Sequence, residues 1–207
     1  MDLKDLNSMQ FDVFRELGNI GAGNAVTALS KLTNLRIDMA VPTVSFLEFN
    51  EIAEKVGGAD KDIAGILINL SGDIEGMMMY ILSTKATRSL VNLMMGSFTT
   101  TALNEDIENY SDIELSALKE VGNIISGAYL SSLSALTNLT IITSVPYLSI
   151  DMAGAVLSVP AIEFGKISDK ALLIDTEFGT SDNSVNGYFV LIPSLDSYGV
   201  ILKSLGL

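Results

Sequence analysis

The chain has 207 residues, 48% of them hydrophobic, and its 25 acidic and 12 basic side chains give a net charge of −13. Nucleic acid and anionic membrane surfaces repel such a protein, so neither is an expected partner. The sequence contains no Cys and no His, which excludes disulfides, thiol nucleophiles, Ser-His-Asp triads and most zinc sites.

The first residues, Met1-Asp2-Leu3-Lys4-Asp5, are acidic and lack the basic-then-apolar order of a signal peptide. No apolar run reaches about 18 residues, so no membrane insertion is expected. The absence of Cys fits a reducing compartment. Together these features predict a cytoplasmic protein.

The first half of the chain predicts a long helix, a strand, a loop, a hairpin and a short helix, over residues 8–34, 35–49, 50–60, 63–82 and 83–95. In the long helix, apolar side chains recur at steps of three and four residues from Phe11 to Leu32, and Ser8 is the predicted N-cap. The sequence Ser71-Gly72-Asp73 is typical of a turn and joins the two hairpin strands.

The second half predicts the same order after a Thr-, Asn- and Glu-rich linker near 96–110. Ser111 and Glu114 form a capping box that begins a helix running to about Asn138. Four strands and a C-terminal helix are expected near 139–150, 153–164, 169–178, 185–192 and from 195 to the end. The hairpin turn, residues 179–186, is expected to be longer than its counterpart in the first half.

Each half therefore reads as a helix, several strands and a helix, which favours an α+β fold over βαβ winding. We expect one largely antiparallel sheet with pseudo-two-fold symmetry, covered on one face by the two long helices. The chain is predicted to be a single domain of two tandem repeats, about 8–95 and 111–207, because a fixed offset of about half the chain indicates two copies of one unit.

The repeat is clearest in a short polar motif inside each long helix. It reads Asp12, Glu16, Gly18, Asn19 and Pro42 in the first half, and Ser116, Glu120, Gly122, Asn123 and Pro146 in the second, at an offset of 104 residues. Positions i, i+4 and i+7 share one helical face, so each copy forms a narrow polar stripe. The glycines and the repeated Val-Pro also have a structural interpretation, as helix packing and the start of a strand.

The stripe suits phosphoryl chemistry. A carboxylate can pair with Lys or Arg, and a carboxamide both donates and accepts, so it can hold a water in a chosen orientation. Positioning an attacking water can suffice for phosphoryl transfer. The sequence has neither a metal site nor a phosphate-binding loop of its own, so the substrate would have to supply both.

These residues resemble the CheC/CheX/FliY family of chemotaxis phosphatases. The family signature is Asp or Ser, three residues, Glu, two residues, Asn, and Pro after about 22 more residues, and both copies match it. Two intact motifs look more like CheC than CheX, and the absence of large additional domains argues against FliY.

The resemblance implies removal of the phosphoryl group from the aspartate of the response regulator CheY. Glu16 and Glu120 would bind the regulator through its active-site Lys, and Asn19 and Asn123 would orient the water. The protein would need no cofactor of its own, since the Mg²⁺ would belong to the regulator. The family also implies binding to the receptor deamidase CheD, so a non-catalytic scaffold or regulator of CheD is the alternative function.

Overall fold

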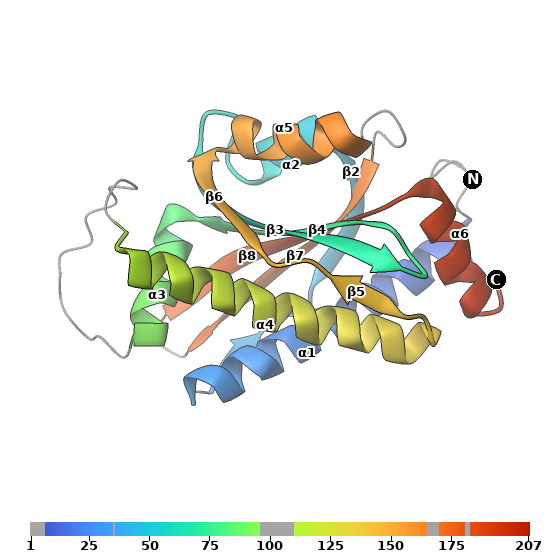
Figure 1. Ribbon diagram of the computed structural model, residues 1–207, viewed down its shortest axis with the longest axis horizontal. Coiled ribbons are helices and arrows are strands. Elements are labelled where there is room, and N and C mark those ends of the chain that lie inside the picture. Colours follow the sequence, from blue (N-terminus) through green and yellow to red (C-terminus); the bar gives the residue numbers. More distant parts are fainter. Residues whose placement is uncertain (1–6, 35, 96–109, 165–169, 181–182) are drawn as a thin grey trace.

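The structure is a computed structural model that describes residues 7–34, 36–95, 110–164, 170–180 and 183–207 (Figure 1). Its first half consists of α1 (Ser8–Thr33), β1 (Asp38–Met39), β2 (Thr43–Glu48), α2 (Phe49–Lys55), β3 (Asp62–Gly72), β4 (Gly76–Ser83) and α3 (Thr84–Met95). The second consists of α4 (Asp112–Thr137), β5 (Ile141–Thr143), β6 (Tyr147–Met152), α5 (Ala153–Phe164), β7 (Lys170–Thr180), β8 (Asn183–Pro193) and α6 (Leu195–Ser204). The element order thus occurs twice. The predicted linker lies outside the described residues except for Tyr110.

Within the described residues, eight strands form one sheet in the order β1-β7-β8-β4-β3-β5, and all of its pairings are antiparallel. The first strands are exchanged between the halves, since β1 and β2 pair with β7 while β5 and β6 pair with β3. The pseudo-two-fold relation therefore passes between the central strands β4 and β8. The predicted α+β fold with one antiparallel sheet is confirmed.

The two long helices begin with capping boxes. For α4 the box is Ser111 with Glu114, as predicted. For α1 the predicted N-cap Ser8 is wrong, because Asn7 accepts a hydrogen bond from the Gln10 backbone while the Gln10 side chain accepts one from the Asn7 backbone. An amide at the N-cap and Gln three residues later satisfy two of the free backbone donors of the first turn.

Both long helices end at the same position of the repeat. Asn34 follows α1 with φ 53° and Asn138 follows α4 with φ 55°. Asn tolerates this left-handed conformation better than most residues, which makes it a common helix terminator. The repeated Leu-Thr-Asn-Leu is therefore the stop signal of each helix.

The sheet is covered on both faces, which corrects two predicted elements. The predicted loop 50–60 begins with the helix α2, and the predicted strand 153–164 is the helix α5. In α5 the β-branched residues favour a strand and Pro160 disfavours a helix interior, yet the helix forms because its apolar side packs on the sheet. Figure 1 shows α2 and α5 above the sheet and α1 and α4 below it.

Side chains of the central strand β4 alternate between two cores. Met78 and Tyr80 belong to the core under α1 and α4, whereas Met77 and Met79 belong to the core under α2 and α5. Every residue from Gly76 to Leu82 is buried, as expected for a strand covered on both faces. The sheet is thus a rigid middle layer, and it fixes the height at which α1 and α4 lie.

The hairpin of the second half has a shorter turn than predicted. The β7–β8 ladder extends to the pair Thr180–Asn183, whereas the sequence suggests a turn over 179–186. Backbone pairing continues through this polar stretch because an antiparallel ladder needs only backbone donors and acceptors. The C-terminal helix α6 starts after the N-cap Ser194, as predicted.

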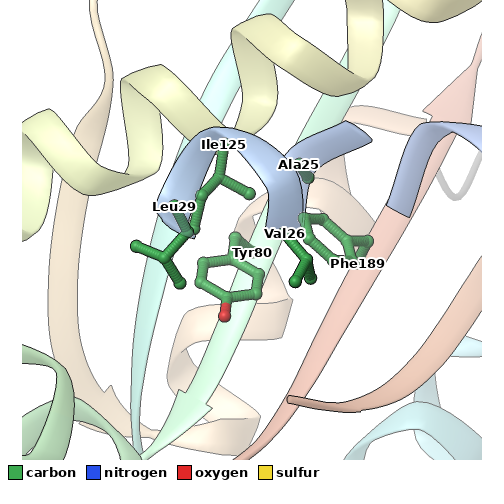
Figure 2. A pocket seen from close by; sticks show the side chains of 6 residues that line it. All are labelled: Ala25, Val26, Leu29, Tyr80, Ile125 and Phe189. Atoms are coloured by element: carbon green, nitrogen blue, oxygen red, sulfur yellow. The ribbon is translucent and has the colours of Figure 1, made fainter. Parts of the chain in front are cut away.

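Where α1 packs against α4, a small residue of α1 faces a large residue of α4. A Cβ atom at Gly21 would collide with the ring of Tyr129, so this glycine leaves room for the tyrosine. At the matching position of the repeat, Ala25 and Ile125 line one narrow gap together with Val26, Leu29, Tyr80 and Phe189 (Figure 2). The gap has no space for a water molecule, so it belongs to the core and is not a binding cavity.

Candidate functional site

The first motif lies on the outer side of α1. Asp12 and Glu16 are exposed, and Asn19 is half-buried. Asp12 forms an ion pair with Arg15 at 2.9 Å, a contact that the sequence analysis did not include, although opposite charges three residues apart on a helix are its signal. Among the described residues, nothing donates a hydrogen bond to the buried Oδ1 atom of Asn19.

The second motif lies in the same way on α4, but it is more open. Ser116, Glu120 and Asn123 are all exposed. The two motif asparagines therefore differ, since Asn123 is exposed and Asn19 is half-buried. The sites share their spacing and differ in the solvent access of the carboxamide.

The motif glycines determine how closely each helix, with its polar stripe, approaches the sheet. A Cβ atom at Gly18 would lie 3.1 Å from Cγ2 of Val44 and 3.3 Å from the side chain of Ile174. A Cβ atom at Gly122 would lie 2.5 Å from Cγ2 of Ile66. Both glycines are buried. They let the helices lie close to the strands, and each directly precedes the asparagine of its motif.

The segment with the motif proline lies close to α1 near the first asparagine. In the first half, the turn before Asn19 contacts β2, and a Cβ atom at Gly23 would lie 3.9 Å from Cε of Met39 in β1. The chain between β1 and β2, which contains Pro42, therefore passes beside Asn19. Pro146 occupies the matching segment between β5 and β6, and both prolines are half-buried. Proline lacks a backbone donor, which suits the edge of a sheet.

The two motifs form two separate sites. Figure 1 shows α1 and α4 side by side and running in opposite directions across one face. The contacts between them are made by Gly21 with Tyr129 and by Ala25 with Ile125. The crossing is therefore centred at the level of Gly23 and Gly127 along the two axes, although neither glycine itself contacts the other helix. Asn19 and Asn123 each precede this central glycine by four residues, about 6 Å along the helix, in opposite directions. Each site is thus completed by its own helix and the strands beside it.

Charge at the sites is available to a partner. Among the described residues, no Lys or Arg pairs with Glu16 or Glu120. In the same part of the chain, no group of three or more acidic side chains is placed to hold a metal ion. None of the described helices combines the length and apolar character needed to cross a membrane. The arrangement offers an exposed carboxylate for a cationic group, with a carboxamide one turn further along.

The segments that carry the two motifs match a family model. The CheC-like family matches residues 9–46 and 113–150. The chain is 35% identical over 201 residues to the CheY-P phosphatase CheC of Bacillus subtilis, covering 95% of this chain and 94% of that protein. FliY of Thermotoga maritima has a similar fold, with a TM-score of 0.76 at 24% identity over 98% of both chains. CheX of Desulfovibrio desulfuricans gives a TM-score of 0.52 at 16% identity over 85% of this chain and 99% of that chain. The protein therefore belongs to the CheC-like family.

Proposed function

We propose that the protein is a phosphatase that hydrolyses the aspartyl phosphate of a CheY-type response regulator. The observation that carries the proposal is the pair of Glu-x-x-Asn stripes, which lie on the outer side of two helices in a protein 35% identical to a CheY-P phosphatase. A side chain that must enter another protein's active site has to project from the surface. The stripe on α4 does so with all three of its side chains, and the stripe on α1 does so with Asp12 and Glu16.

In each stripe the Glu carboxylate and the Asn carboxamide have different roles. Glu16 and Glu120, which pair with no Lys or Arg in the described part of the chain, dock a Lys of the regulator. Asn19 and Asn123 hold a water in line with the phosphorus, since a carboxamide can accept from the water and donate to the phosphoryl oxygens. The Mg²⁺ bound by the regulator stabilises the charge on the phosphoryl group. This chain orients the water and positions the regulator.

The test is the loss of phosphate from a purified, phosphorylated CheY-type regulator with and without this protein. Acceleration that saturates with regulator concentration supports the proposal. A rate that stays at the regulator's own value over the whole concentration range contradicts it.

We expect the two sites to contribute unequally. The carboxamide oxygen of Asn19 is buried, whereas Asn123 is exposed, and Asp12 is already held by Arg15. Asn123→Ala should therefore lower turnover more than Asn19→Ala, by about threefold or more. Single-turnover rates of the two variants measure the difference, and equal residual rates would contradict this prediction.

Glu16→Lys is expected to weaken docking at the first site, because it places a cation against the regulator's Lys. In the Asn123→Ala background, which leaves only the first site, KM should rise about tenfold, as like charges in contact commonly cost 1 kcal/mol or more. The value of kcat should change much less. Glu54→Lys, at an exposed position of α2 on the other face of the sheet, makes the same charge change and is the matched control. An unaltered KM for Glu16→Lys would refute the docking role.

The resemblance also predicts CheD as a partner and a non-catalytic CheD scaffold as the alternative function. The two functions predict different effects of the double variant, Asn19→Ala with Asn123→Ala. A scaffold keeps its full effect in this variant, whereas a phosphatase loses its activity. Titration of CheD against wild type and the double variant, alongside the phosphate assay, separates the two.

A further inference from the structure

Exposed apolar side chains occur at matching positions of the two repeats. Met9 is 62% exposed and its counterpart Ile113 66%, while Val41 is 87% exposed and Val145 88%. Large apolar side chains elsewhere on the surface, such as Val159, have no such counterpart, except for Leu32 and Leu136 at the ends of the long helices. An apolar side chain so open to water contributes no burial free energy to the folded monomer. Its occurrence at the same position of both repeats therefore requires an explanation.

Met9 and Ile113 continue the polar stripes. Met9 precedes Asp12 by three residues and Glu16 by seven, so it lies on the same helical face. Ile113 has the same relation to Ser116 and Glu120. Each stripe therefore starts with an exposed apolar side chain, about 15 Å along the helix from its asparagine.

Val41 lies in the chain segment near the other end of the first stripe, and Val145 has the matching position in the second repeat. The chain between β1 and β2 passes beside Asn19, as the contacts of α1 with Val44 and Met39 show. Val41 lies in this segment directly before the motif proline, and Val145 precedes the proline between β5 and β6. Proline restricts the preceding residue to an extended conformation, which holds the valine in place at the sheet edge.

We propose that Met9 and Val41 at the first site, and Ile113 and Val145 at the second, are apolar anchors that dock the receiver domain of the phosphorylated regulator. This inference rests on the proposed function. The occupant follows from continuity, because the anchors flank the same stripe that presents Glu and Asn to the regulator. A partner footprint of about 800 Å² is wide enough to cover both ends of a stripe. Apolar anchors surrounding a charged contact supply affinity, while the Glu–Lys pair supplies orientation.

The anchors are tested one site at a time. Val41→Ala and Met9→Ala are made in a background of Asn123→Ala and Glu120→Lys, which is expected to remove both catalysis and docking at the second site. They are compared by steady-state phosphate release and by the Kd for the receiver domain held in its active form by beryllium fluoride. Val41→Ala deletes two methyl groups, so KM and Kd should rise on the order of tenfold, with kcat nearly unchanged. Val145→Ala in a background of Asn19→Ala and Glu16→Lys should do the same at the second site. Val159→Ala, on α5 at the opposite face of the sheet, is the matched control and should change neither value.

Unchanged Kd and KM for both Val41→Ala and Val145→Ala would overturn the inference. A parallel fall in kcat and melting temperature would also overturn it, because it would show a structural role. The binding measurement separates this failure from failure of the proposed function. If wild type binds the receiver but does not accelerate phosphate loss, the phosphatase proposal fails, and the effect of the valine variants on Kd still decides whether the anchors dock the receiver.

Discussion

Asn19→Ala combined with Asn123→Ala is expected to abolish the acceleration of phosphate loss, so that the regulator decays at its own rate. Each alanine removes the carboxamide that is proposed to orient the attacking water, and the two substitutions together remove it from both stripes. Removing one positioned donor from a catalytic site commonly costs about 10²–10³-fold in rate. With both sites affected, turnover should fall at least about 100-fold.

The same variant should fold normally. Asn123 is exposed, and Asn19 has a buried oxygen to which nothing in the described chain donates. Alanine removes that uncompensated polar atom and favours the helix. The free energy of unfolding should therefore change by less than about 1 kcal/mol or increase, which denaturant titration can measure. Asn24→Ala is the matched control, because Asn24 is exposed on the same helix and bonds only the Ile20 carbonyl.

Two outcomes would contradict the assigned role. Turnover equal to wild type in the double variant would show that the asparagines do not orient the water. An equal loss in Asn24→Ala would show that the assay responds to any change on α1. A loss confined to the motif positions, with binding of the regulator retained, is the expected result.

The motif could be placed from the sequence because its geometry is local. The i, i+4 and i+7 spacing fixes one helical face without reference to the rest of the fold, and the structure has Glu16 and Glu120 exposed on that face. The half-buried state of Asn19 could not be predicted, because it depends on tertiary packing around α1, to which the segment between β1 and β2 lies close. That segment is held by β7, about 130 residues further along the chain.

The strand pairing and the helices α2 and α5 likewise depend on long-range contacts that the local sequence does not reveal. The repeat predicts two equivalent halves, yet it cannot tell whether a half pairs its first strands with itself or with the other half. The exchange of β1 and β2 onto β7 is a long-range choice. The helices α2 and α5 were missed because a helix of seven residues and one with an internal Pro160 have weak local signals. Their burial against the sheet provides the stability that the isolated segments lack.

Gly122→Ala is expected to destabilise the fold and to disable the second site together. The new methyl group would lie 2.5 Å from Cγ2 of Ile66, and a β-branched side chain in a buried strand cannot swing aside. Overpacking of this kind costs about 1–3 kcal/mol, against which alanine recovers about 1 kcal/mol of helix propensity. If α4 rises to relieve the contact, Asn123 moves with it, and a displacement of about 1 Å can cost 100-fold in rate.

Ile66→Ala tests whether this contact is the cause. Alone it should cost about 2–5 kcal/mol, because it leaves a cavity under α4. Together with Gly122→Ala the new methyl group partly fills the cavity, so the pair should be more stable than the sum of the single changes by about 0.5–3 kcal/mol. Activity of the second site, measured in the Asn19→Ala background, should recover in parallel.

Gly127→Ala provides the control on the same helix. A Cβ atom there would meet nothing within 4 Å, so this change should stabilise the fold by up to about 1 kcal/mol through helix propensity alone. A Gly122→Ala variant that behaves like Gly127→Ala, with full stability and full activity, would show that the glycine does not set the height of the stripe. Opposite signs for the two glycines, with rescue by Ile66→Ala, would tie the position of Asn123 to the packing of α4 on β3.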